Sequence, residues 1–250
     1  PCSAESEKQV LATAHELKKH DNLIFRAGIW KPRTRPNSFE GIGIEGLNWL
    51  KKVKDETGLK TTVEVAKAKH VELSIKHGVD ILWVGARTTG NPFAIQEIAD
   101  ALKNTDIPVL VKNPINPELN LWIGAIERLQ DAGVYNIAAI HRGFFTYKNS
   151  KYRNIPQWQL ALDLKRKFPD LPMICDPSHI SGDSDLIMEI SQKAMDMSYD
   201  GLMIETHIDP ENALSDKEQQ ITPSELDEIL NNLIVRNFDI DDKEFKATLK

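Results

Sequence analysis

Short apolar, β-branched runs alternate along the chain with segments whose apolar residues recur at helical spacing. The runs predict strands at residues 23–28, 61–65, 80–86, 107–113, 136–143, 172–178 and 200–206. The amphipathic segments predict helices at 4–19, 44–56, 67–77, 92–103, 118–131, 156–167, 184–195 and 223–234. Strict alternation of strand and helix predicts a parallel sheet covered by helices.

The number of units favours a closed barrel. The first predicted element is a helix, for which Ser3 is a candidate N-cap, and a leading helix needs a strand to pack on. One strand before Pro1 would give eight βα units, the number found in a TIM barrel of about 250 residues. No G-x-G-x-x-G motif follows a predicted strand, so an open dinucleotide-binding sheet lacks its main signal.

We therefore expect an α/β protein with a (β/α)8 TIM barrel over residues 1–237, whose first strand lies before residue 1. The charged residues 238–250 are expected to be a linker or the start of a C-terminal extension.

Composition narrows the classes of function. A formal charge of −6 argues against a nucleic-acid partner, because such domains usually carry a broad basic face. No apolar run approaches the ~20 residues of a membrane span. The two cysteines imply no disulfide framework, and no signal-peptide pattern opens the chain, so we predict a cytoplasmic protein without a membrane partner.

Cations gather where the predicted strands end, although the chain as a whole is acidic. Within the span from the second to the sixth strand of the expected barrel, they are Arg26, Lys31, Arg33, Arg87, Lys112 and Arg142. Since parallel strands end on one side of a barrel, these charges would repel one another in an empty pocket. Arginine and lysine suit phosphate and carboxylate, so small phosphorylated metabolites are the expected ligands. Arg35 is expected to be a solvated rim charge.

A second set of polar residues follows the remaining strands. In a closed barrel Cys2, His179 and Glu205 would come from three adjacent strand ends, with Asp216 in the next loop. Each alone has an ordinary reading, because a terminal cysteine is usually structural and 37 acidic residues must lie somewhere. Together, sulfur, nitrogen and oxygen donors suit Mn, Fe, Co or Zn better than Ca or Mg.

These motifs carry a family resemblance. "PCS", "KPRT", "GART", "HRG", "DPSH" and "E-x-H" followed by "ALSD" resemble the type I beta branch of the 3-deoxy-D-arabino-heptulosonate 7-phosphate (DAHP) synthase family, from Pro1 to about residue 235. That family is a metal-dependent barrel that condenses phosphoenolpyruvate with erythrose 4-phosphate, the first step of the shikimate pathway. Its members are commonly homodimers or homotetramers. Some carry a fused C-terminal chorismate mutase domain, and residues 238–250 resemble the junction to one.

The resemblance also implies roles for individual residues. The metal ligands would be Cys2, His179, Glu205 and Asp216, with manganese the favoured ion. The residues implied to hold phosphoenolpyruvate are Arg26, Lys31, Arg87, Lys112 and Arg142. Those implied for erythrose 4-phosphate are Arg33 and Thr34 at its phosphate, with Pro32 and Asp216 near its hydroxyls. Glu64 would lie near the reacting carbon, and Lys31, between the two sites, is the candidate proton donor.

Two alternatives remain at this point. The sister family, 3-deoxy-D-manno-octulosonate 8-phosphate synthase, uses arabinose 5-phosphate and resembles K-A-N-R where this chain has "KPRT" at 31–34. A non-catalytic barrel that senses phosphorylated metabolites would keep the cations and lose the metal donors, whereas all four donors are present here.

Overall fold

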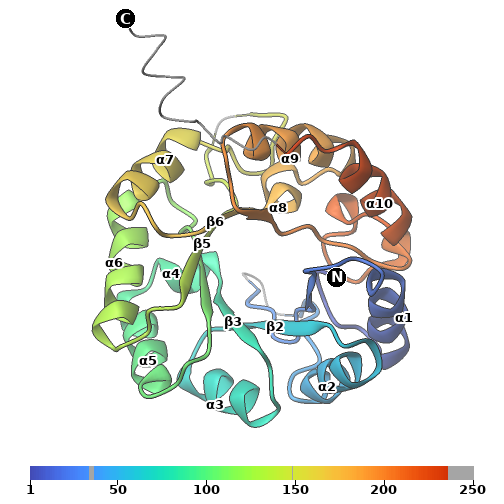
Figure 1. Ribbon diagram of the computed structural model, residues 1–250, viewed down its shortest axis with the longest axis horizontal. Coiled ribbons are helices and arrows are strands. Elements are labelled where there is room, and N and C mark those ends of the chain that lie inside the picture. The colour runs from blue at the N-terminus through green and yellow to red at the C-terminus, as the bar shows by residue number, and fades with distance from the viewer. Residues whose placement is uncertain (34–36, 148, 236–250) are drawn as a thin grey trace, which may run out of the picture.

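The computed structural model describes residues 1–33, 37–147 and 149–235 of the chain. A curled parallel sheet forms the inner wall, and the helices form a ring around it (Figure 1). The sheet contains β1 (Ile24–Arg26), β2 (Lys60–Val65), β3 (Ile81–Val84), β4 (Val109–Lys112), β5 (Ile137–His141), β6 (Met173–Cys175) and β7 (Gly201–Leu202). All seven predicted strands are confirmed, and their spatial order follows the chain from β1 to β7.

The eight predicted helices are also present. They are α1 (Glu7–Leu17), α2 (Glu45–Thr57), α3 (Ala68–Lys76), α5 (Pro92–Leu102), α6 (Leu119–Asp131), α7 (Trp158–Lys167), α9 (Ile187–Asp196) and α10 (Pro223–Asn232). The described residues also contain two short α-helices that were not predicted, α4 (Ala86–Thr89) and α8 (Pro177–Ser181), each starting just beyond a strand end. Three single-turn 3-10 helices, η1 (Ser184–Leu186), η2 (Pro210–Asn212) and η3 (Lys217–Gln219), were not predicted either.

The predicted N-cap of the first helix is wrong by one turn. Ser6 caps α1 by accepting a hydrogen bond from the Gln9 backbone N–H. Ser3 lies outside the helix, which begins at Glu7, and its hydroxyl contacts Ser215 Oγ at 2.7 Å and donates to Glu5 Oε1. The segment before the helix instead runs across the end of β1, where the Ala4 backbone N–H donates to Gly28 O.

The barrel is not closed by the described residues. β1 pairs with β2 and β7 pairs with β6, but no pairing joins β1 to β7 across residues 1–33, 37–147 and 149–235. A cavity of about 430 Å³ lies between them, lined by Pro1, Phe25, Leu202, Met203 and other largely apolar residues. The described part of the chain thus supplies seven of the expected eight strands.

The sheet is buried on both faces, as expected where helices cover a parallel sheet. Outward-facing residues pack with the helices in the main core, which includes Phe25, Leu82 and Trp122. A smaller cluster fills the inside of the curled sheet, with Ile81, Trp83, Leu110, Ala138, Ile140 and Met203. Successive strand residues alternate between these two cores.

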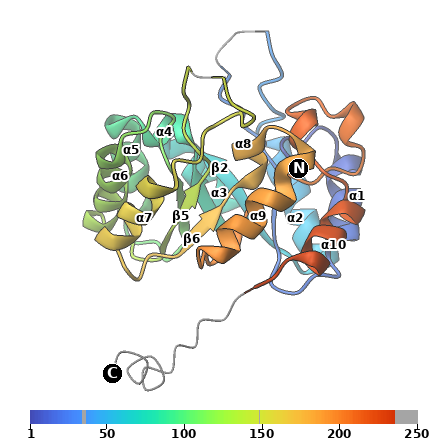
Figure 2. The same ribbon diagram turned by 90° about the horizontal axis from the view of Figure 1, so that it is seen from above.

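The described parts of the loops after β1 and β5 lie at one end of the barrel, the end at which the strands finish (Figure 2). The predicted domain boundary at residue 237 and the segment 238–250 lie outside the described residues, so the chorismate mutase junction stays a prediction. Among the residues that the structure describes, no helix is both long and apolar enough to span a membrane.

Candidate active site

Two of the predicted cations terminate strands and are almost fully buried. Arg26 is the last residue of β1 and is 7 % exposed, and Lys112 is the last residue of β4 and is 3 % exposed. Both lie over the indole of Trp83 in β3, with Arg26 Cζ 5.1 Å and Lys112 Nζ 4.4 Å from the ring centroid. The ends of β1 and β4 thus place two positive charges over the face of one indole ring.

Each of these cations pairs with a carboxylate. Arg26 Nη2 lies 3.0 Å from Glu205 Oε1, and Lys112 Nζ lies 2.7 Å from Asp176 Oδ2. Burial lowers the pKa of Lys112, and the Asp176 charge only partly offsets this effect. Arg26 Nε and Nη1 are buried without a hydrogen-bond partner among the described residues. Since buried donors are normally satisfied, these two are suited to an anionic ligand.

Arg142 follows β5 and is held by a residue that the sequence did not single out. Its Nη1 donates to Asn154 Oδ1 at 2.9 Å, and its backbone N–H donates to Asn113 Oδ1. Asn154 Nδ2 in turn donates to His179 O at 2.6 Å, so the loop after β5 joins Arg142 to the segment that carries His179. Burial lowers the pKa of Arg142 to about 10, with Arg153 and Arg87 adding to the effect.

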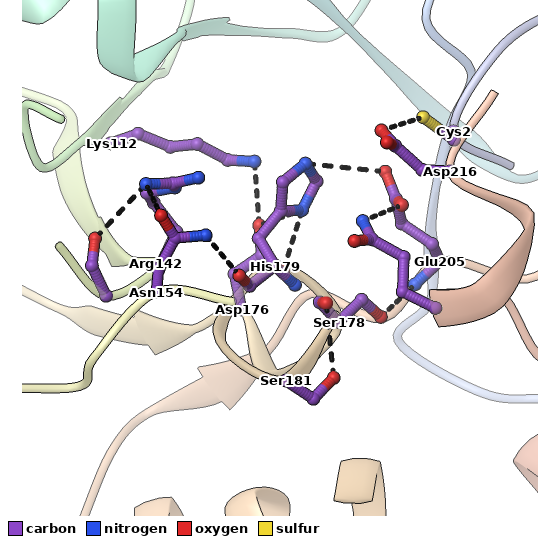
Figure 3. Close-up of polar contacts among 12 residues, drawn as sticks. Cys2, Lys112, Arg142, Asn154, Asp176, Ser178, His179, Ser181, Glu205 and Asp216 are labelled. Atoms are coloured by element: carbon purple, nitrogen blue, oxygen red, sulfur yellow. Dashed lines mark hydrogen bonds and ion pairs between the residues drawn. The ribbon is translucent and has the colours of Figure 1, made fainter. Parts of the chain in front are cut away.

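Three of the four predicted metal ligands converge. Ligand atoms of Cys2, Glu205 and Asp216 all lie within 4.8 Å of one another, and Cys2 Sγ is 3.1 Å from Asp216 Oδ2. His179 stands beside this group, with Nε2 3.9 Å from Glu205 Oε1. Figure 3 shows these donors on one side of the site and Lys112 and Arg142 on the other, with His179 and Asp176 between them.

The donor set fits a divalent cation. Glu205 Oε1 is buried and makes no hydrogen bond among the described residues, although it forms the ion pair with Arg26. Burial and the Glu205 charge raise the pKa of Cys2 to about 12, so its thiolate needs a further positive charge nearby. Burial would also raise the pKa of Glu205, but His179, Arg26 and Lys31 outweigh it and lower that pKa to about 2. A bound metal ion would stabilise both anionic ligands.

Polar side chains hold the donor segments together. Gln220 Oε1 accepts from the Cys2 backbone N–H at 2.8 Å, and Gln219 Nε2 donates to Glu205 Oε2 at 2.7 Å. Arg153 Nη1 contacts both Asp216 Oδ1 and Gln219 Oε1. The sequence motifs did not identify these three supporting residues, because loops bring them together from distant positions.

Lys31 and Glu64 face one small cavity of about 180 Å³, which Pro32 also lines. Lys31 Nζ lies 2.8 Å from Cys2 O and 2.9 Å from Cys2 Sγ, so it lies against the donor set. Burial raises the pKa of Glu64, and the charges of Lys31 and Lys112 partly oppose this shift. Gly85 allows the carboxylate its position, because a Cβ there would lie 1.8 Å from Glu64 Oε1.

The remaining predicted residues are less central. Arg87 lies on α4 at the exposed rim. Arg33 Nε donates to Phe39 O within its own loop, and Thr34 and Arg35 lie outside the described residues. Of the predicted residues, the structure thus brings Arg26, Cys2, Glu205 and Asp216 into one region, with Lys112 beside Arg26 at the Trp83 ring.

Fold and site together define a class: parallel (β/α)-barrel proteins with cations and mixed sulfur, nitrogen and oxygen donors at the carboxyl ends of the strands. Residues 1–237 match the model of the DAHP synthetase I family, and the chain belongs to that family.

Curated relatives bear related names. The chain is 30 % identical to the phospho-2-dehydro-3-deoxyheptonate aldolase of Thermotoga maritima, over 88 % of this chain and 63 % of that protein. It is 27 % identical to a 2-dehydro-3-deoxyphosphooctonate aldolase of Helicobacter pylori, over 94 % of this chain and 92 % of that protein. The chain thus spans less than two thirds of the Thermotoga relative.

Solved structures confirm the fold. A crystal structure of the Thermotoga maritima DAHP synthase superimposes with a TM-score of 0.82 at 28 % identity, over 92 % of this chain and 65 % of that one. A truncated form of 3-deoxy-D-arabino-heptulosonate 7-phosphate synthase from Thermotoga maritima gives a TM-score of 0.79 at 25 % identity, over 100 % of this chain and 85 % of that one.

Proposed function

We propose that the chain condenses phosphoenolpyruvate with erythrose 4-phosphate and water, giving 3-deoxy-D-arabino-heptulosonate 7-phosphate and inorganic phosphate. This reaction would be the first step of the shikimate pathway. The observation that carries the proposal is that two sets of residues meet at one end of the barrel. One is the cation floor, formed by Arg26 and Lys112 over the Trp83 ring, and the other is the Cys–carboxylate donor set. Lys31 contacts the donor set at Cys2 Sγ. Family membership supports the same reaction.

The cation floor would hold phosphoenolpyruvate. Its phosphate and carboxylate would neutralise the positive charge of Arg26, Lys112 and Arg142, which the carboxylates of the protein neutralise only in part. Arg26 Nε and Nη1 have no hydrogen-bond partner among the described residues. Arg87 and Lys31 would complete the set from the rim and the β1–α2 loop. Binding there would fix the reacting carbon against Glu64 and the aldehyde, and such orientation contributes several kcal/mol to catalysis.

The donor half would hold the divalent ion through Cys2, Glu205, Asp216 and the adjacent His179. A divalent ion in this position supplies Lewis-acid polarisation of a carbonyl oxygen. Manganese is our preferred ion among Mn, Fe, Co and Zn. Arg33 and Thr34 would receive the phosphate of erythrose 4-phosphate, with Pro32 and Asp216 near its hydroxyls.

Proton handling would fall to Lys31 and Glu64. As the enol carbon attacks the aldehyde, the aldehyde oxygen gains charge, and Lys31 would donate a proton to it. Water then adds to the second carbon of phosphoenolpyruvate, and the tetrahedral adduct expels phosphate. Glu64 faces the same cavity as Lys31, and burial raises its pKa above that of an exposed carboxylate, which suits a role in proton exchange.

A second candidate is the five-carbon sister reaction with arabinose 5-phosphate. It is favoured by the Helicobacter relatives, of which this chain covers 92 %. Against it stands "KPRT" at 31–34, the pattern that the resemblance links to the four-carbon substrate. A non-catalytic sensor would need no donor set.

The test measures phosphate release from phosphoenolpyruvate by the purified chain. Erythrose 4-phosphate and arabinose 5-phosphate are offered separately, after chelation and again after adding Mn(II). Turnover restored by metal with the four-carbon sugar supports the proposal. Turnover with the five-carbon sugar would instead assign the sister reaction to the chain. Binding of phosphoenolpyruvate without turnover would indicate a sensor.

For assembly and location, we propose a homodimer or homotetramer in the cytoplasm. Both cysteines are unpaired in the structure, as expected in a reducing compartment. Light scattering of the purified chain would give its mass in solution, and a monomer at all concentrations would contradict the first part.

A further inference from the structure

Trp83 occupies an unusual place inside the barrel. It lies in the middle of β3, is 4 % exposed, and faces the inner cluster together with Ile81, Leu110 and Met203. Above this apolar cluster lie the charged ends of Arg26, from β1, and Lys112, from β4. One indole therefore contacts two cations that different strands deliver.

Two buried cations so close to one ring create an electrostatic difficulty. Burial penalises both charges, and they also repel each other. Carboxylates relieve part of this cost, since Glu205 pairs with Arg26 and Asp176 pairs with Lys112. A carboxylate, however, also occupies N–H donors that an anionic ligand would otherwise use.

An aromatic face solves this difficulty in another way. The face of an indole carries negative potential and attracts a cation within about 6 Å of its centre, but it takes up no strong hydrogen-bond donor. Arg26 fits this description, because its Nε and Nη1 have no hydrogen-bond partner among the described residues while Cζ lies 5.1 Å from the ring centroid. The ring therefore supports the charge and leaves the donors available.

We propose that Trp83 is a positioning residue of the anion site, whose ring face holds Arg26 and Lys112 side by side and keeps Lys112 charged for a phosphorylated ligand. The inference rests on the proposed function only for the nature of that ligand. The competing explanation is that Trp83 merely fills the inner core with Ile81, Leu110 and Met203. Core filling depends on the size of the ring, whereas support of cations depends on its electron density.

The experiment separates size from electron density. Trp83 is replaced at that single site by mono-, di- and trifluorotryptophan, which keep nearly the same shape but progressively weaken the negative face. Calorimetry then gives the Kd for inorganic phosphate and for phosphoenolpyruvate, over a range of pH. The control carries the same fluorinated residues at Trp49, a buried position on α2.

We expect both Kd values to rise stepwise along the Trp83 series, by roughly 3- to 10-fold in total. The pH above which phosphate no longer binds should fall along the series, because Lys112 loses support for its charged form. The Trp49 series should leave both quantities unchanged. Trp83→Phe, which keeps a weaker aromatic face, should lie within the range of the fluorinated series.

A flat Trp83 series in a folded protein overturns the inference and leaves core filling as the role of the ring. Failure of the unmodified protein to bind either anion also overturns it, because no anion site would then exist. Failure of the proposed function looks different. Phosphate binding would still weaken along the series, but neither sugar phosphate would support turnover.

Discussion

The two halves of the site are built by different means. The cation floor is fixed by the sheet, because Arg26 and Lys112 are the last residues of hydrogen-bonded strands. The donor set is assembled from irregular segments, and its Cys2 and Asp216 are 214 positions apart in the chain. Backbone pairing thus positions one half, whereas side-chain contacts from Gln219, Gln220 and other loop residues position the other. We expect the donor half to tolerate change less well.

The cation floor and the donor set meet at Asp176, which the sequence analysis includes only as part of the motif "DPSH". Its Oδ2 lies 2.7 Å from Lys112 Nζ and 3.0 Å from His179 Nδ1. It also caps α8 by accepting from the His179 backbone N–H. One buried carboxylate therefore orients a cation of the floor and a neighbour of the donor set.

The largest effect is expected from Asp176→Asn, which removes the link between the halves. It leaves Lys112 as an unpaired buried cation, which should cost about 3–5 kcal/mol of unfolding free energy. Both the Kd for phosphoenolpyruvate and the Kd for Mn(II) should rise. Urea denaturation and calorimetry measure these quantities. Asp183→Asn, at an exposed capping aspartate, is the matched control, and equal stability of the two variants would contradict the assigned role.

Cys2→Ala should damage the donor half alone. Loss of one ligand should weaken Mn(II) binding by at least about 100-fold, because even residues behind the ligands usually contribute 10- to 100-fold. Competition with a chelator measures this affinity. Phosphate binding should stay within a factor of about two, and Cys175→Ala, which removes the other buried thiol, is the control. Unchanged metal affinity would exclude Cys2 as a ligand.

Arg142→Ala should damage the cation half alone. Its guanidinium is available to phosphate beyond its contact with Asn154, and loss of charged hydrogen bonds costs about 2–3 kcal/mol. We therefore expect roughly 30- to 100-fold weaker binding of phosphoenolpyruvate by calorimetry, with Mn(II) affinity retained. Arg128→Ala, on the exposed side of α6, is the control. Parallel losses of both affinities would show that the halves are not separable.

His141 tests the support beneath Arg142 without changing the charge of either half. The ring donates from Nε2 to Pro156 O at 2.6 Å and accepts at Nδ1 from the Tyr199 hydroxyl at 3.0 Å. Burial lowers the pKa of His141 to about 4 from its ordinary 6.5. Between these values the unfolded chain binds the proton and the folded protein does not, so stability is retained above the unfolded pKa and falls as the pH decreases.

This difference corresponds to about 2 kcal/mol lost between pH 7 and pH 5. In His141→Gln, urea unfolding at the two pH values should show a difference smaller by about that amount. His15→Gln, at an exposed position of α1, should leave the difference as it was. A pH dependence identical to that of the native chain would mean that His141 is not buried in its neutral form.

The sequence predicted the sheet well, because burial on both faces imposes apolar strands and their spacing reflects the helices between them. It also placed Arg26, Lys112, Cys2, Glu205 and Asp216 in one region, since barrel strands end on one side. It did not reveal Asn154, Arg153, Gln219 or Gln220. Their partners are set by the paths of irregular loops, for which residue spacing has no fixed period. The short helices α4 and α8 were not predicted because four or five residues are too few to show a helical period.

The order of strands in the sheet has a consequence for how the molecule forms. Each strand pairs with its neighbour in the chain, so most sheet contacts join nearby segments and can form progressively during synthesis. Arg26, Trp83 and Lys112, which form the cation floor, all lie in the first half of the chain and are synthesised early. Cys2 emerges before all of them yet meets Asp216 only after more than two hundred further residues have been made. The ability to retain a metal ion would therefore arise only after the segment that carries Asp216 has folded, and it would distinguish the folded barrel from its partly folded precursors.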